Sequence, residues 1–225
     1  MTEISVIMAV FNGGNDVIRA IESVQKQTFK SFQFIIVDDC STDGTPDKIT
    51  KYLRNSSIRW NLIQNKYNMG NEQTALKAYQ NCNSKWMIRI DHDDEFCNNT
   101  LETLINDSDG YDMVYGSYLE IFPTDIRTVV PSNPMECLAC GMLYNTKSIA
   151  SAGGYLHLDV GIFMEYDLNI RLINNGAKIL TKPDIVYKYY RRSGSVTHNK
   201  DKVTDSINKI KEKWGDKWAN QIRKY

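Results

Sequence analysis

The sequence predicts an α/β protein in which helices cover one mostly parallel sheet. Three apolar runs, 4–11, 32–37 and 58–63, are each followed by a polar loop and then by apolar residues at helical spacing. Such strand–loop–helix units in succession build a parallel sheet with right-handed crossovers. The loops that follow these runs are rich in Asp, Asn and Gly. Because parallel strands end at the same edge of a sheet, we expect the loops to lie together and to form the functional site.

The three units differ in how their helices begin. In the first unit the strand ends at Asn12, and four apolar residues then recur at helical spacing: Val17, Ile18, Ile21 and Val24. In the second unit Thr45 is the expected N-cap and Pro46 the expected first helical residue. In the third unit the loop 65–71 leads to a helix whose apolar side includes Ala75.

A fourth apolar run, 86–88, leads into an acidic cluster that contains Asp91, Asp93 and Asp94. Unpaired carboxylates this close together repel one another, and their pKa values rise. Mg²⁺ and Mn²⁺ take oxygen ligands, which include carboxylates and substrate phosphates. An ordinary solvated loop or a helix N-cap is the alternative explanation. We favour a cation site, because the cluster is expected at the same sheet edge as the other polar loops.

The pattern changes in the second half of the chain. The run 113–122 predicts a longer strand, 123–125 a turn and 127–130 an antiparallel hairpin partner, so the sheet becomes mixed. A short helix follows and ends at Gly153 and Gly154. Its N-cap is one of three residues: Asn145, Thr146 or Ser148.

The last third predicts a helix, a strand and a helical tail. The segment 163–173 forms a helix with Glu165 near its start, and 185–190 forms a strand. From about Thr204 onward the tail is an amphipathic helix. Its apolar residues recur at three- and four-residue steps: Val203, Ile207, Ile210, Trp214, Trp218 and Ile222. That face either packs on the protein's own core or a partner, or contacts a membrane surface.

Composition excludes several classes of function. The 27 basic and 27 acidic residues balance, so nothing indicates a nucleic-acid partner. No apolar run approaches the roughly 18 residues of a membrane span, and the start of the chain does not resemble a signal peptide, so we expect a cytoplasmic protein of one domain. The five cysteines are scattered, and Cys137 and Cys140 form a lone pair, so we expect neither disulfides nor a zinc or redox site.

Several ordered motifs together resemble the inverting family-2 glycosyltransferases of the GT-A fold. The motifs are Val10-Phe11-Asn12, the loop 37–45, Asn68-Met69-Gly70-Asn71, Asp91-His92-Asp93-Asp94, Gly153-Gly154-Tyr155, and Glu165-Tyr166-Asp167-Leu168 with Arg171. The resemblance implies a GT-A α/β/α sandwich over 1–200, with a nucleotide-binding half 1–110 and an acceptor half 111–200. The amphipathic tail is 201–225.

The resemblance also implies an activity and its ligands. The protein would move a sugar from a nucleotide-sugar donor, with a UDP-sugar favoured, to a hydroxyl of a glycan or glycoconjugate. Asp93 and Asp91 would hold Mn²⁺ or Mg²⁺, with Asp91 binding sugar hydroxyls as well or instead, and Asp94 would support them or cap the next helix. The expected nucleotide-sugar-binding residues are Val10, Phe11, Asn12, Asp38, Asp39, Ser41, Lys66, Asn68, Gly70, Asp91, His92, Asp93 and Arg192.

Some of these residues have alternative explanations. Asp39 is expected to accept the N–H of the nucleobase, as a uracil edge would offer. Phe11 either packs near the base or is a core aromatic, and the loop that contains Lys66 and Asn68 either contacts the nucleotide or only forms a turn. We expect the side chain of His92 to point away from the ligand.

An attacking acceptor hydroxyl must lose a proton, so a carboxylate near the acceptor is expected as general base. By resemblance this base is Glu165. The family usually has an acidic pair here, whereas this chain has Met164 before Glu165. Asp167 is the competing base, although an i,i+4 pair with Arg171 explains it better.

The loop after strand 185–190 departs from the family, because Arg192 stands where many members have a histidine. An arginine can bind a phosphate directly. His198 is near enough in sequence to replace that histidine, but an incidental role is favoured. Two other functions stay open: a non-catalytic nucleotide-sugar binding protein, and a sugar-phosphate nucleotidyltransferase, whose glycine- and arginine-rich phosphate loop the sequence lacks.

Overall fold

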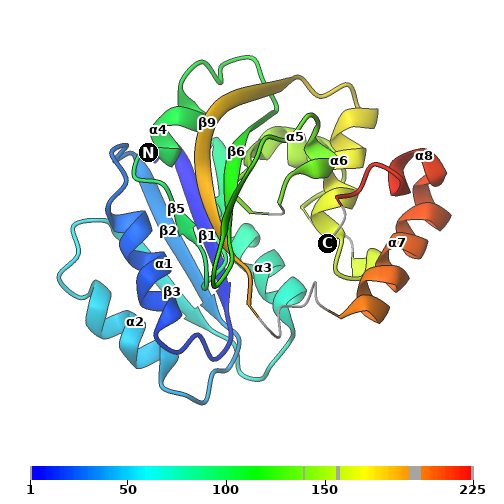
Figure 1. The fold of residues 1–225 in the computed structure, drawn as a ribbon. Coiled ribbons are helices and arrows are strands. Elements are labelled where there is room, and N and C mark those ends of the chain that lie inside the picture. Colours follow the sequence, from blue (N-terminus) through cyan, green and yellow to red (C-terminus); the bar gives the residue numbers. More distant parts are fainter. Residues whose placement is uncertain (1, 139, 156–157, 193–198, 224–225) are drawn as a thin grey trace.

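The computed structural model of the chain describes residues 2–138, 140–155, 158–192 and 199–223. These residues contain one nine-stranded sheet with the order β3-β2-β1-β4-β8-β6-β9-β5, in which β7 pairs with β6 (Figure 1). Helices cover both faces, as the sequence predicts. His198 lies outside the described residues.

The first four strands of the chain form the parallel part of the sheet. They are β1 (Ile4–Val10), β2 (Phe32–Asp38), β3 (Arg59–Gln64) and β4 (Trp86–Arg89). Every residue of β1, β2 and β4 is buried, which explains why these strands read as continuous apolar runs rather than as alternating ones. Their carboxyl ends share one edge of the sheet, at the bottom of Figure 1.

The rest of the sheet is mixed. Its strands are β5 (Glu95–Phe96), β6 (Met113–Ile121), β7 (Ile126–Val129), β8 (Leu143–Asn145) and β9 (Ile179–Tyr190). Strand β8 is antiparallel to both β4 and β6, while β9 runs parallel to β6. The expected hairpin is confirmed, because β7 pairs antiparallel with β6.

Two hydrophobic clusters flank the sheet, one on each face. One cluster joins β1 to α1 (Asp16–Gln25), α2 (Thr45–Leu53) and α4 (Thr100–Ile105). The other joins it to α3 (Asn71–Gln80), α5 (Thr146–Ser151) and α6 (Met164–Asn174). Short 3-10 turns at Pro134–Glu136 and Leu158–Val160 connect the second half. The result is the expected three-layer sandwich.

The N-cap expected at Thr45 is wrong. Gly44 occupies the N-cap in a left-handed conformation, and Thr45 is the first residue of α2. The carboxylate of Asp43 accepts the Thr45 backbone N–H at 3.0 Å and its hydroxyl at 2.6 Å. The carboxylate that binds the first residue of the helix therefore belongs to Asp43, the residue directly before the N-cap. At α5, by contrast, Asn145 is the cap among the three candidates, because its side chain accepts the N–H of Lys147.

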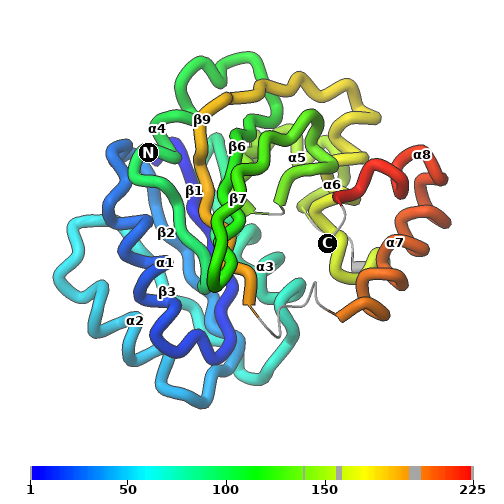
Figure 2. The backbone as a smooth tube through the Cα atoms, in the orientation of Figure 1, coloured from blue at the N-terminus to red at the C-terminus, as the bar shows by residue number. Residues whose placement is uncertain are grey.

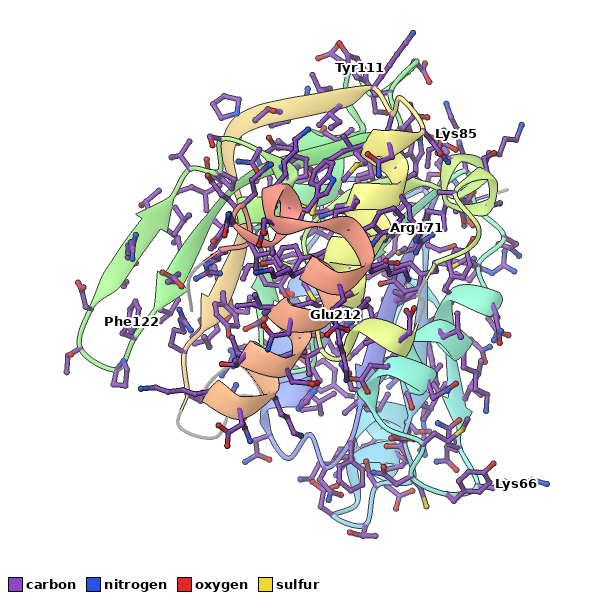
Figure 3. All side chains as sticks on the ribbon, turned by 90° about the vertical axis from the view of Figure 1, so that its right-hand side faces the viewer. Lys66, Lys85, Tyr111, Phe122, Arg171 and Glu212 are labelled. Atoms are coloured by element: carbon purple, nitrogen blue, oxygen red, sulfur yellow. The ribbon has the colours of Figure 1, made fainter. Side chains whose placement is uncertain are left out.

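The tail is two helices rather than one. Helix α7 (Lys200–Trp214) and α8 (Asp216–Ala219) meet at Gly215, whose φ of 87° breaks the helix. Both pack outside α6 (Figure 2). Ile210 and Ile222 are buried in the same cluster as α6, so the apolar face docks on the protein's own core, which is the first of the expected alternatives. In Figure 3, Glu212 on α7 lies on the outer side of that layer, and Arg171 marks α6 behind it.

No helix in the described part of the chain is long and apolar enough to cross a membrane. The five cysteines are free, with Cys137 and Cys140 buried.

Candidate functional site

The loops after β1, β2 and β3 are joined by hydrogen bonds at the carboxyl edge of the sheet. The N–H of Asn12 donates to the hydroxyl of Ser41 at 2.8 Å, and the Asn12 side chain accepts the N–H of Thr42 at 2.9 Å. The N–H of Asp39 donates to the carbonyl of Val10 at 2.8 Å. Four of the expected nucleotide-binding residues are therefore brought together.

Asp39 organises the loop that follows β3. Its Oδ1 accepts from Nδ2 of Asn65 and from the N–H of Met69, and its Oδ2 accepts from the N–H of Gly70, each at 2.8 Å. A carboxylate offers about four lone-pair positions, so three protein donors leave room for one more. Asp38 is also buried, and its Oδ1 has no hydrogen-bond partner among the described residues.

The other residues at this end lie at the rim. Phe11 is 44% exposed, so the core-aromatic explanation is wrong. Asn68 accepts the N–H of Gly70 at 3.2 Å, as in a simple turn. Figure 3 shows Lys66 at the outer edge with its side chain directed away from the body. The ring of His92 lies beside Gly13, where an added Cβ would come within 3.3 Å of it.

The three aspartates after β4 form a group. One carboxylate oxygen from each of Asp91, Asp93 and Asp94 lies within 4.8 Å of the others. Asp94 is buried and accepts the N–H of Tyr190 and the hydroxyl of Tyr187, both at 2.9 Å. Its bonds fit a role in supporting the turn, while Asp91 and Asp93 remain partly exposed.

Crowding and burial change the acidity of this group. Burial and the charge of Asp91 raise the pKa of Asp93, although His92 and Arg192 act to lower it. Burial and the charges of Asp93 and Asp91 raise the pKa of Asp94 well above its usual range. For Asp91, burial opposes ionisation, but Arg89 and His92 still hold its pKa below the usual value. A bound cation would relieve the repulsion that raises the other two.

Arg89, the last residue of β4, connects this group to the start of α6. Its Nη2 donates to Oδ1 of Asp91 at 2.8 Å, and its Nη1 donates to Oε1 of Glu165. The hydroxyl of Tyr155 lies 3.4 Å from the same oxygen of Glu165. Burial raises the pKa of Glu165, an effect that Arg89 opposes. A single side chain, that of Arg89, therefore links the expected base to Asp91 of the acidic cluster. The side chain of Met164 is buried in the core.

Asp167 is engaged by protein groups on all sides. It is fully buried, and its Oδ2 accepts Nε of Arg171 at 2.8 Å, which is the expected i,i+4 pair. Its Oδ1 accepts Nε1 of Trp214 at 2.8 Å and lies 3.1 Å from Nζ of Lys213. These contacts fix α7 on α6 and favour the structural explanation over the competing base.

Arg192 lies against the acidic cluster. Its guanidinium donates to the carboxylate of Asp16 and, at 2.9 Å, to the backbone carbonyl of Asp93. Arg19 donates to the same carbonyl, and its guanidinium carbon lies 4.1 Å from the centre of the Tyr190 ring. Two arginines from distant segments therefore hold the turn that carries Asp93.

Sequence reasoning gave no role to four residues that shape the site, Arg19, Arg89, Tyr155 and Tyr187, although Tyr155 stands in one of the motifs that carry the resemblance. Tyr187 accepts the N–H of Asp91 at 3.2 Å and donates to Asp94, so it ties β9 to the cluster. Gly141 makes room for it, because an added Cβ would approach the Tyr187 ring to 2.8 Å. Arg89 carried a signal of its own, since a charged residue at the end of an otherwise apolar strand needs a partner when it is buried.

Residues 5–161, more than half of the chain, match the family described as glycosyl transferase family 2. The Escherichia coli protein named UDP-Glc:alpha-D-GlcNAc-diphosphoundecaprenol beta-1,3-glucosyltransferase WfaP is 26% identical over 215 residues, which are 90% of this chain and 82% of the relative. The Campylobacter jejuni GalNAc(5)-diNAcBac-PP-undecaprenol beta-1,3-glucosyltransferase is 31% identical over 121 residues, 53% of this chain. The chain spans 39% of the length of that relative and a smaller share of the length of some other relatives.

Solved structures share the fold at low sequence identity. S. aureus TarS 1–349 in complex with UDP-GlcNAc superimposes with a TM-score of 0.77 at 19% identity, over 93% of this chain and 67% of that one. The mannosyltransferase PcManGT from Pyrobaculum calidifontis, in complex with GDP-Man and Mn²⁺, gives a TM-score of 0.73 at 14% identity, over 93% of this chain and 64% of that one. Together with the family match, they show that the chain belongs to glycosyl transferase family 2 and has its GT-A fold.

Proposed function

We propose that this protein is an inverting glycosyltransferase that transfers a sugar from a UDP-sugar to a hydroxyl of a glycan or glycoconjugate. The observation that carries the proposal is the placement of Asp91 and Glu165 on one buried arginine, Arg89, with Asp93 beside Asp91 at the carboxyl edge of the sheet. In a single displacement at the anomeric carbon, the carboxylates that hold the sugar donor and the base that deprotonates the acceptor must lie close together.

The acidic cluster fits a divalent cation. Its ligand atoms are hard carboxylate oxygens that lie within 4.8 Å of one another, and their mutual repulsion favours a positive ion. Asp93 and Asp91 would hold Mn²⁺ or Mg²⁺, with Asp94 fixing the turn. When bound, the ion supplies Lewis-acid stabilisation of the charge on the leaving diphosphate. Arg192 and Arg19 both contact the backbone carbonyl of Asp93, so they would place positive charge near the diphosphate.

Glu165 is the proposed general base. It stands in the first turn of α6, and burial raises its pKa above the usual range of a glutamate although Arg89 opposes this. A base whose pKa is closer to neutral accepts a proton more readily from the acceptor hydroxyl as that hydroxyl attacks. Asp167 is not needed for this step, because it is bound to Arg171 and Trp214.

The loops after β1 to β3 would hold the nucleotide. Asp39 has room for one further donor, which the N–H of a uracil would supply, and the unpartnered Oδ1 of Asp38 lies in the same loop. Phe11 offers an exposed ring at the end of β1 on which a base can pack. Val10, Asn12, Ser41 and Gly70 would shape the loops, and Lys66 and His92 would lie at the rim.

The names of two relatives support a proposal for the acceptor class, because they describe saccharides joined through a diphosphate to undecaprenol. We take a lipid-linked glycan as the acceptor of this chain too. Such an acceptor is held in a membrane, so the enzyme would work at the membrane surface from the cytoplasmic side. The apolar face of α7 would not make that contact, because it is buried against α6.

UDP release tests the proposal. Purified protein with Mn²⁺ is incubated with UDP-glucose or UDP-N-acetylglucosamine, with and without a synthetic short-chain lipid diphosphate that carries α-N-acetylglucosamine. We expect one donor to yield UDP, faster with the acceptor, and a β-linked product in its proton NMR spectrum. Absence of UDP release from both donors, or an α-linked product, would contradict the proposal.

A further inference from the structure

A single buried arginine joins the two ends of the site that perform different chemistry. Arg89 is 4% exposed, and its Nε and Nη2 donate to Oδ1 of Asp91 at 3.1 and 2.8 Å. Its Nη1 donates to Oε1 of Glu165, and its Nη2 also lies 3.3 Å from Oδ1 of Asn71. One planar group therefore connects the motif at the end of β4 with the first turn of α6.

The contacts fall on one oxygen of each carboxylate. Both nitrogens that reach Asp91 bind Oδ1, and the two side-chain donors that reach Glu165 within the described residues, from Arg89 and Tyr155, both bind Oε1. Asp91 also accepts a hydrogen bond from the thiol of Cys140. Among the described residues no side chain other than Arg89 and Tyr155 is seen to donate to Glu165, so Glu165 is held at Oε1 and can meet a substrate with Oε2.

The chemistry of this bridge requires arginine. A guanidinium presents its N–H groups in a fixed plane and keeps its charge, so it can bind two carboxylates in two directions at once. A lysine ammonium carries the same charge at one point on a flexible stem. It can neutralise one of the carboxylates but cannot fix the angle between them. Burial between two acids is what makes this cation tolerable in the core.

We infer that Arg89 is a positioning residue that sets Glu165 with Oε2 toward the acceptor hydroxyl, at a fixed distance from the donor side held by Asp91. This inference rests on the proposed function and deepens it. It states that Arg89 acts through Glu165 rather than by contact with the sugar nucleotide. The expected signature is a loss of turnover without a loss of donor affinity.

The test compares the wild-type protein with Arg89→Lys, Glu165→Gln and the double variant. UDP release is measured with water as acceptor, from whichever of UDP-glucose and UDP-N-acetylglucosamine the wild-type protein uses, and UDP binding with Mn²⁺ is measured by calorimetry. For Arg89→Lys we expect about 100-fold slower UDP release, since a small misplacement of a reacting group has an effect of that size, with the Kd for UDP within threefold. The double variant should be no slower than Glu165→Gln alone, because Arg89 acts through the base. Arg54→Lys, an exposed arginine at the end of α2, is the matched control and should behave as wild type.

Three results would overturn the inference. Arg89→Lys could release UDP within threefold of the wild-type rate, which removes any positioning role. It could lose UDP affinity and turnover together, which makes it a donor-binding residue. The two losses could instead multiply in the double variant, which makes Arg89 independent of Glu165. Failure of the proposed function is a different outcome, because the wild-type protein itself would then release no UDP.

Discussion

Replacing Glu165 with glutamine is expected to lower the rate of UDP release from the UDP-sugar that the wild-type protein uses about 1,000-fold, which is within the usual contribution of a general base. Glutamine has almost the same shape and keeps an oxygen that can accept from Arg89 and Tyr155. It cannot take up a proton from an attacking hydroxyl. Arg89 also keeps its bonds to Asp91, so the variant should fold and bind UDP with a Kd within threefold of wild type.

Asp167→Asn separates this role from that of the competing carboxylate. Asp167 is buried and bound to Arg171 and Trp214, so its neutralisation should lower the melting temperature, by about 4 °C for a protein of this size, and leave the rate per folded molecule nearly unchanged. If Asp167→Asn instead removed turnover while Glu165→Gln kept it, the assignment of the base would be wrong. Retention of turnover by both variants would require a base elsewhere.

Asp93→Asn should have opposite effects with and without a metal. Without Mn²⁺ the melting temperature should rise by about 2 °C at neutral pH. The reason is that burial and Asp91 raise the pKa of Asp93, so folding disfavours its ionised form, and a neutral side chain removes that penalty. With Mn²⁺ the wild-type protein should be stabilised and the variant should not. UDP release should fall at least 100-fold, as when one stabilising charge is lost from a transition state.

The control for this prediction is Asp205→Asn, because Asp205 is a carboxylate on α7 that pairs only with the neighbouring Lys209 in the ion pairs of the described residues. It should respond to Mn²⁺ as wild type does. Stabilisation of Asp93→Asn by Mn²⁺ to the wild-type extent would show that the ion binds elsewhere, and the acidic cluster would then lose its proposed role.

The sequence predicts the parallel half of the fold well and the mixed half less completely. Strands β1 and β2 are buried on both faces, so each appears as an apolar run with a single polar residue inside it, Ser5 or Gln33, and ends within a residue of its predicted end. Strands β8 and β5 have three and two residues, too few for any period to show, and they exist because neighbouring strands pair with them. The tail divides at Gly215, a glycine that could have predicted a helix end but that the apolar spacing, continued to Trp218 and Ile222, concealed.

The same contrast holds for the site. The aspartates after β4 could be placed at the sheet edge, because a strand fixes where its own end lies. The bond between Arg89 and Glu165 joins residues 76 positions apart and depends on how α6 packs across the sheet, which no local pattern encodes. The partners of Asp167 show this too, since Trp214 reaches it only because α7 folds back over α6.

Calorimetric titration with UDP, GDP and dTDP, each with Mn²⁺ and then with excess chelator, tests the central claim most directly. The account predicts that UDP binds more tightly than the other two, through the loops that hold Asp39 and Phe11, and that its affinity falls at least tenfold when the metal that Asp91 and Asp93 hold is removed. UDP binding that is unchanged by the chelator would contradict the metal site and leave the diphosphate to Arg192 and Arg19. Absence of binding by all three nucleotides would contradict the account as a whole.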